Sequence, residues 1–106
     1  MERTKHNQVA TAIKYFFEEV MQMLVKIRTI YTLDDYLLIT IFDNNKIVEY
    51  DMKEDIQTLP NYSDLKSING LWQQAQIDKS RTCVFWNDYI DLPCDTIYEY
   101  GKEIKI

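Results

Sequence analysis

The chain has few of the residues from which many catalytic and cofactor sites are built. Gly70 and Gly101 are its two glycines, and neither lies in a G-x-x-x-x-G-K or G-x-G-x-x-G pattern, so a glycine-rich phosphate loop is excluded. The single histidine is His6, and neither Cys83 nor Cys94 has a histidine near it in the sequence. Nucleophilic catalysis by a Cys-His or Ser-His-Asp arrangement is therefore disfavoured. We predict no catalytic residue, no bound cofactor and no metal site.

Long hydrophobic runs, closely spaced cysteines and excess positive charge are also missing. No apolar run approaches the roughly 20 residues needed to span a bilayer, so no membrane segment is expected. Cys83 and Cys94 are too far apart to form a C-x-x-C redox pair or a zinc half-site, which predicts a protein of the reducing cytoplasm. The formal net charge of −5 disfavours nonspecific binding to nucleic acid, because such binding needs clustered Lys and Arg.

The chain of 106 residues is 46% hydrophobic, which is enough for one small folded domain. Its first part, residues 1–22, is predicted to contain an amphipathic helix from Asn7 to about Gln22. The apolar residues of this segment recur at helical spacing and continue to Leu24 on the same face: Val9, Ile13, Phe16, Phe17, Val20 and Leu24. Residues 23–106 are predicted to form a single α+β domain.

Within 23–106, runs of β-branched and aromatic residues predict strands at 24–31, 36–42 and 46–52, with turns at Asp34-Asp35 and at 43–45. Short helical turns are expected at 53–59 and at 64–68, the second with Ser63 as N-cap. Residues 75–78 and 82–86 predict a hairpin. Pro93 is expected near the start of a last helix and Gly101 at its end. The predicted fold class is therefore α+β, with one small antiparallel sheet made of a meander plus a C-terminal hairpin.

Acidic and aromatic residues gather near the C-terminal end. Asp88, Asp91, Asp95 and Glu99 have no basic residue among them, and the last three would share one helical face if a helix includes them all. Such carboxylates can bind a hard cation or a basic partner, but capping of a helix N-terminus is the favoured interpretation. The aromatic residues nearby, Trp86 and Tyr98 among them, favour core packing or a partner interface over a stacking platform for single strands, which would need a positive groove.

The spacing of these residues resembles a known signature. Residues 84–99 read V-F-W-N-D-Y-I-D-L-P-C-D-T-I-Y-E, in which a Trp is followed by Asp-Leu and then by Asp-Thr-Ile-Tyr-Glu. This is similar to the domain-of-unknown-function 2442 family of small bacterial proteins, over about Met23 to Glu99. The match lies in these residues: Trp86, Asp91, Leu92, Asp95, Thr96, Ile97, Tyr98 and Glu99.

The resemblance implies a compact α+β domain, often encoded beside another small protein in a pairing that looks like toxin and antitoxin. Family members begin near Met23, so residues 1–22 are either a translated leader or a genuine extension. The chain departs from the family at Asn87, Asp88, Tyr89 and Cys94. Tyr89 replaces a glycine and suits positive φ poorly, so either the turn differs or Asp88 takes the left-handed conformation.

We therefore predict a non-catalytic protein-interaction or regulatory module, either antitoxin-like or associated with a phage or mobile element. Its candidate partner surface is acidic and aromatic and consists of Trp86, Asp88, Asp91, Asp95, Tyr98 and Glu99. The expected partner is a protein, which a basic surface would suit, and a homodimer through the N-terminal helix or a sheet edge is a further expectation. The alternatives are a nucleic-acid-associated regulator and an enzyme that uses carboxylates such as Asp88 and Asp91.

Overall fold

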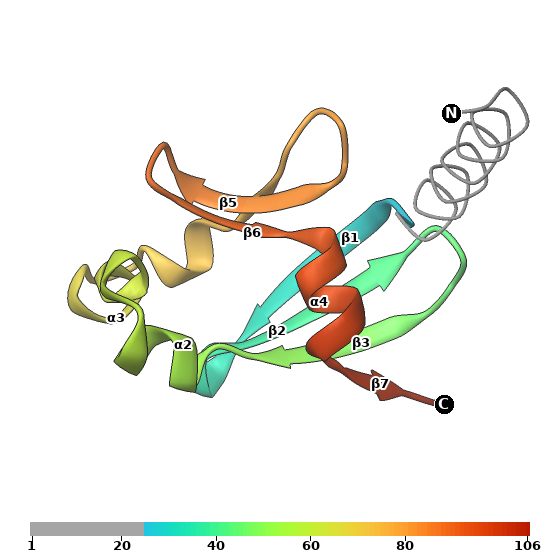
Figure 1. The fold of residues 1–106 in the computed structure, drawn as a ribbon, viewed down its shortest axis with the longest axis horizontal. Helices are drawn as coiled ribbons and strands as arrows, with labels where there is room; N and C mark the ends of the chain where they lie inside the picture. The colour runs from blue at the N-terminus through green and yellow to red at the C-terminus, as the bar shows by residue number, and fades with distance from the viewer. Residues whose placement is uncertain (1–24) are drawn as a thin grey trace, which may run out of the picture.

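The computed structural model describes residues 25–106, which form an α+β fold with two small antiparallel sheets and a few short helices. The predicted α+β class is confirmed. The prediction of one sheet is wrong, because the C-terminal hairpin belongs to a second sheet that shares no strand pairing with the meander. Figure 1 shows this hairpin beside β1, at the far end of the helical segment that follows the meander. The helix predicted in residues 1–22 lies outside the described residues.

Sheet A has the strand order β1-β2-β3-β7. Its first three strands, β1 (Ile27–Leu33), β2 (Leu37–Phe42) and β3 (Ile47–Asp51), are the predicted meander. The edge strand β7 (Lys102–Ile104) returns antiparallel to β3 and pairs Ile104 with Ile47. The sequence gives no strong signal for β7, because three residues are too few to establish a period of two.

The two turns of sheet A lie where the acidic and Asn residues predict them. The first contains the short 3-10 helix η1 (Asp34–Tyr36), in which Asp35 and Tyr36 have φ of 65° and 58°. In the second, Asn45 has φ of 71° and donates its N–H to the carbonyl of Phe42 at 2.9 Å. Asn and Asp tolerate the left-handed conformation better than most residues, so these positions suit a tight turn.

Sheet B has the order β4-β5-β6 and is the smaller of the two. The predicted hairpin is confirmed as β4 (Gln76–Ile77) paired with β5 (Cys83–Asn87). The third strand, β6 (Ile90–Pro93), pairs with β5 and was not predicted. Its four residues alternate between apolar and exposed side chains, which is the only strand signal that so short a segment can carry.

The helices are short and join the sheets. They are α2 (Lys53–Thr58), α3 (Asp64–Ser67) and α4 (Cys94–Tyr100), with 3-10 turns η2 (Pro60–Tyr62) and η3 (Trp72–Gln74) between them. Ser63 occupies the predicted N-cap position of α3, but its side chain does not cap the helix. Its hydroxyl donates instead to the carbonyl of Pro60 at 2.8 Å. No helix among residues 25–106 is long and apolar enough to cross a membrane.

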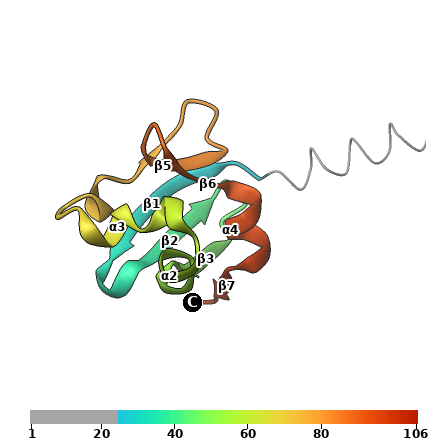
Figure 2. The same ribbon diagram turned by 60° about the vertical axis from the view of Figure 1, so that its left-hand side comes forward.

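The core lies between the inner face of sheet A, the inner face of sheet B and the helices, which Figure 2 shows from a second direction. Sheet A contributes an aliphatic part around Leu38 and Val48, and sheet B together with η3 contributes an aromatic part around Trp86 and Trp72. The hydrophobic side chains with no exposed surface are Ile27, Leu38, Phe42, Val48, Met52, Val84 and Ile97. The core is thus shared by both sheets, and the fold is one unit.

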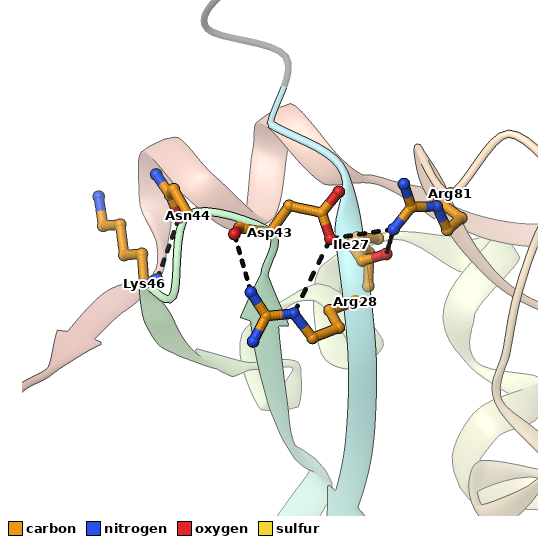
Figure 3. Close-up of polar contacts among 6 residues, drawn as sticks. All are labelled: Ile27, Arg28, Asp43, Asn44, Lys46 and Arg81. Atoms are coloured by element: carbon orange, nitrogen blue, oxygen red, sulfur yellow. Dashed lines mark hydrogen bonds and ion pairs between the residues drawn. The ribbon is translucent and has the colours of Figure 1, made fainter.

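A polar junction joins the two sheets at the start of β1 (Figure 3). Arg81 donates its guanidinium N–H to the carboxylate of Asp43 at 2.9 Å and to the carbonyl of Ile27 at 3.4 Å. In return the carbonyl of Arg81 accepts the N–H of Ile27 at 2.8 Å, and Arg28 donates to the carbonyl of Asp43 at 2.8 Å. The second sheet is therefore held by backbone and charged contacts that link β1, the β2–β3 turn and the β4–β5 loop.

Candidate functional site

The β5–β6 hairpin carries the first half of the candidate surface. Its side chains alternate between the core and the outer face of sheet B. Val84, Ile90 and Leu92 point into the core and are at most 2% exposed. The residues between them, including Phe85 and its cross-strand partner Asp91, lie on the outer face of sheet B. Phe85 is half-buried and Asp91 is exposed, so this face presents a carboxylate directly beside an aromatic ring.

Trp86 does not reach the surface. Its side chain is 4% exposed and stacks on Trp72, with ring centroids 5.7 Å apart and an angle of 18° between the planes. Its indole N–H donates to the carbonyl of Trp72 at 3.0 Å. A bulge between Phe85 and Asn87 interrupts the register at this residue. We therefore correct its assignment to the candidate surface: Trp86 is a core residue that supports the surface from beneath.

The turn that joins β5 to β6 presents Asp88 and Tyr89 to solvent. The side-chain oxygen of Asn87 accepts the N–H of Tyr89 at 2.9 Å, which closes a local turn. Neither Asp88 nor Tyr89 has positive φ, so the turn differs from the glycine-containing form and a tyrosine fits without strain. The ring of Tyr89 is 85% exposed, and the turn therefore places an aromatic side chain where a partner can contact it.

Asp91 and the two later acids lie on different elements. Asp91 belongs to β6, whereas Asp95 and Glu99 lie on α4, so the face shared by all three does not form. Pro93 is the N-cap of α4, and the carboxylate of Asp95 accepts the N–H of Thr96 at 2.9 Å, as expected for an acid in a first helical turn. Asp95 and Glu99 remain four residues apart on the exposed side of α4.

Gly101 ends α4, as predicted, but for a different reason. Its φ of −77° is ordinary, so the left-handed conformation that usually favours glycine at a helix end is not used here. A β-carbon at this position would overlap the side chain of Val48 and the carbonyl of Ile97. The glycine therefore permits the close approach of the helix end to β3.

Tyr98 anchors α4 to sheet A. Its ring packs edge-on against Phe42, with centroids 5.0 Å apart, and its hydroxyl accepts a hydrogen bond from the side-chain amide of Asn44 at 3.0 Å. The ammonium of Lys46 lies 3.9 Å from the ring centroid, a cation–π contact. Tyr98 is half-buried, so it contributes an edge to the candidate surface while most of its contacts are internal.

We define the acidic surface as the four exposed acids of the candidate surface together with the exposed Tyr89, which the sequence analysis did not include: Asp88, Tyr89, Asp91, Asp95 and Glu99. Its residues belong to the β5–β6 turn, to β6 and to α4, and Figure 1 shows where these elements lie. The ion pairs among residues 25–106 involve Asp43 and Asp51, and none reaches a carboxylate of this surface. The acidic surface therefore carries net negative charge that the described part of the chain does not neutralise.

The carboxylates of the acidic surface do not converge. Among the residues from 25 onward, no group of three or more His, Cys, Asp or Glu side chains is placed to hold a metal ion. A hard cation needs several oxygens at close range, and these acids are distributed over a turn, a strand and a helix. The arrangement suits contact with an extended basic surface better than enclosure of one ion.

The pKa values of the two cysteine thiols near this surface are raised, which disfavours the reactive thiolate form. A position at a helix start favours thiolate in principle, but burial raises the pKa of the Cys94 thiol and the adjacent Asp95 carboxylate raises it further. Burial also raises the pKa of Cys83, against a smaller opposite effect of the Leu92 N–H. Both thiols are free. At neutral pH they are therefore protonated and poor nucleophiles.

The basic residues close to the β2–β3 turn are engaged within the chain. Arg28 and Arg81 both contact Asp43 (Figure 3). Lys46 lies over the ring of Tyr98. A phosphate backbone would have to compete with these contacts. The sequence shows the basic residues but not their pairing, because Arg81 and Asp43 are 38 positions apart.

A second feature that the sequence analysis missed lies at the opposite end of sheet A. An open hollow of about 700 Å³ is lined by β3, the start of α2 and the end of α4, and Tyr50 donates its hydroxyl to the carboxylate of Asp55 at 2.7 Å within it. Burial, followed by the hydrogen bond to Asp55, raises the pKa of Tyr50. Tyr50 and Asp55 are five residues apart across a strand-to-helix junction, a spacing that no sequence pattern marks. The hydrogen bond of this pair links the end of β3 to α2.

No protein-family profile, curated protein or solved structure matches this chain. The resemblance to the domain-of-unknown-function 2442 family therefore stays a prediction, and the geometry of the acidic surface carries the argument on function.

Proposed function

We propose that the chain is a non-catalytic protein-interaction module whose acidic surface binds a basic protein partner. One observation carries this proposal: four exposed carboxylates lie on one continuous stretch of chain, and none pairs with a base among residues 25–106. Electrostatic complementarity of this kind directs association and specificity. The buried Val84, Ile90 and Leu92 fix the β5–β6 hairpin that carries Asp88 and Asp91, so the backbone of this hairpin needs little ordering on binding.

The exposed ring of Tyr89 supports the same function. Tyrosine is enriched at protein interfaces because it offers a large contact area and a polar hydroxyl at low entropic cost. At 85% exposure it adds nothing to the core, and it projects from the turn between Asp88 and Asp91. An antitoxin-like or mobile-element regulator of the cytoplasm is the biological setting that we propose for such a module.

The test is capture of partners from native lysate with the tagged full chain at low and at high salt. The matched variants each remove three negative charges. The site variant carries D91N, E99Q and D95N, in which Asn can still accept the Thr96 N–H; the control variant carries E54Q, D64N and E103Q, which are exposed acids elsewhere.

We expect one basic protein that binds the unmodified chain and the control variant, is lost with the site variant, and is released by salt. Equal capture by both variants would contradict the proposal. Retention of nucleic acid instead of protein would favour the nucleic-acid-associated alternative. Turnover of a small molecule that ceases with D88N or D91N would favour the carboxylate enzyme.

A further inference from the structure

The outer face of sheet A is apolar where a solvent-facing sheet is normally polar. Cross-strand pairing places Tyr31 beside Ile39, Leu33 beside Leu37, and Ile41 beside Ile47. These pairs alternate along the strands with the buried residues of the core, so they point to the opposite side of the sheet. We call this set the outer apolar face: Tyr31, Leu33, Leu37, Ile39, Ile41 and Ile47.

None of the described elements covers this face. The six side chains are neither buried in the hydrophobic core nor packed against it, whereas α4, α2 and sheet B contact the inner face (Figures 1 and 2). Tyr31 is 54% exposed and Leu33 is 44% exposed, and the other four are half-buried. Residues 25–106 therefore leave an aliphatic and aromatic surface on three adjacent strands.

An uncovered face of this composition predicts an occupant. Antiparallel sheets that face water carry polar side chains on that side, and contiguous apolar patches on protein surfaces mark contact sites. The cross-strand rows of this face run from β1 across β2 to β3, and those through Ile47 and Glu49 continue to β7. Among the paired residues of these rows, the charged ones lie at the β3 and β7 end, where Glu49 pairs with Lys102 and Asp51 pairs with Leu37. The apolar area is concentrated on β1 and β2, next to the start of the described chain.

The chain itself contains a segment that matches this surface. Residues 7–24 repeat apolar side chains at helical spacing, and the stripe ends at Leu24, immediately before Val25 and close to the first residue of β1. A helix from Asn7 to Gln22 would be about 24 Å long, and the seven residues of β1 extend about 23 Å. The stripe contains Phe16 and Phe17, which are large enough to cover a sheet surface made of Ile and Leu.

We propose that residues 7–24 pack as an amphipathic helix on the outer apolar face of sheet A in the same chain. Its stripe contacts Ile39, Ile41 and Ile47, and its polar side, with Thr11 and Glu18, faces solvent. Sheet A would then be covered on both faces, by α4 and sheet B on one side and by the N-terminal segment on the other. This surface is separate from the acidic surface, so the proposal does not depend on the proposed function.

The test uses the full chain in solution, labelled with ¹³C at isoleucine methyl groups. We expect nuclear Overhauser contacts from the methyl groups of Ile39, Ile41 or Ile47 to the rings of Phe16 and Phe17. A mixture of labelled and unlabelled chains, recorded with isotope filtering, separates contacts within a chain from contacts between chains. Contacts that persist only within one chain support the proposal.

Matched variants separate docking from loss of the fold. F16D places a charge on the apolar stripe, and T11D places the same charge on the polar side. We expect F16D to abolish the methyl-ring contacts and to speed amide exchange at Ile39 and Ile41, while T11D changes neither. Contacts only between chains, or no contact between either ring and the three isoleucines in the unmodified protein, would overturn the proposal.

Discussion

The two sheets build their shared core in different ways. Around sheet B the core is aromatic, and each large side chain also makes a directional bond: Trp86 donates to the carbonyl of Trp72, Trp72 donates to the carbonyl of Leu33 at 2.9 Å, and Tyr62 donates to the carbonyl of Asp91 at 2.7 Å. On sheet A the inner face is mostly aliphatic, with Phe42, Tyr50 and Thr40 among the exceptions. Tyr50 at its edge donates to Asp55, but the aliphatic side chains around Leu38 and Val48 are held by packing, and the buried hydroxyl of Thr40 has no partner in the described chain.

This difference indicates which region fixes the candidate surface. The aromatic region bonds to backbone carbonyls on η3, β1 and β6, so it links elements that are far apart in the sequence. The tyrosine bond to Asp91 holds the strand that carries the middle of the acidic surface. Sheet A instead contributes buried apolar surface, and its stability depends on close packing of Leu38, Val48 and their neighbours. Substitutions in the two regions should therefore have different sizes and even different signs.

The largest expected effect is at Trp86. W86A removes a buried indole that stacks on Trp72 and leaves the carbonyl of Trp72 without its donor, so the free energy of unfolding should fall by about 3 to 5 kcal/mol. Urea unfolding measures this loss. Y89A, on the same hairpin but with an exposed ring, should change stability by less than about 0.5 kcal/mol. Similar losses in the two variants would show that the aromatic region is not the main support of the hairpin.

Alternation and turn chemistry were enough to predict the meander, the β4–β5 hairpin and the short helices. They did not predict that the hairpin forms a second sheet, because neither the strand pairing nor the Arg81–Asp43 contact that joins the two sheets is encoded by a local pattern. The four acids of the candidate surface were found from charge alone. Trp86 was placed with them because proximity in sequence does not reveal which side of a bulged strand a ring occupies.

The next effect concerns the place where α4 meets sheet A. G101A adds a β-carbon that overlaps Val48 and the carbonyl of Ile97, so we expect a loss of about 1 to 3 kcal/mol from overpacking. Gly70 provides the contrast, since its φ of 86° is left-handed but no atom lies near an added β-carbon. G70A should therefore cost only about 1 kcal/mol, the conformational penalty of the left-handed region. If G70A lowers the free energy of unfolding more than G101A does, the end of α4 lies farther from β3 than the overlap at Gly101 implies.

The smallest expected effect has the opposite sign and lies in the aliphatic region. Thr40 is fully buried between its cross-strand neighbours Ile30 and Val48, and its hydroxyl has no hydrogen-bond partner among residues 25–106. T40V keeps the branched shape and removes the buried polar atom, so the free energy of unfolding should rise by about 1 kcal/mol. Thr29, which pairs with Ile41 and is half-buried, is the matched control, and T29V should change stability by less than about 0.5 kcal/mol. Loss of stability in T40V would mean that the hydroxyl finds a partner in solution, and the aliphatic region would then depend on a directional bond as the aromatic region does.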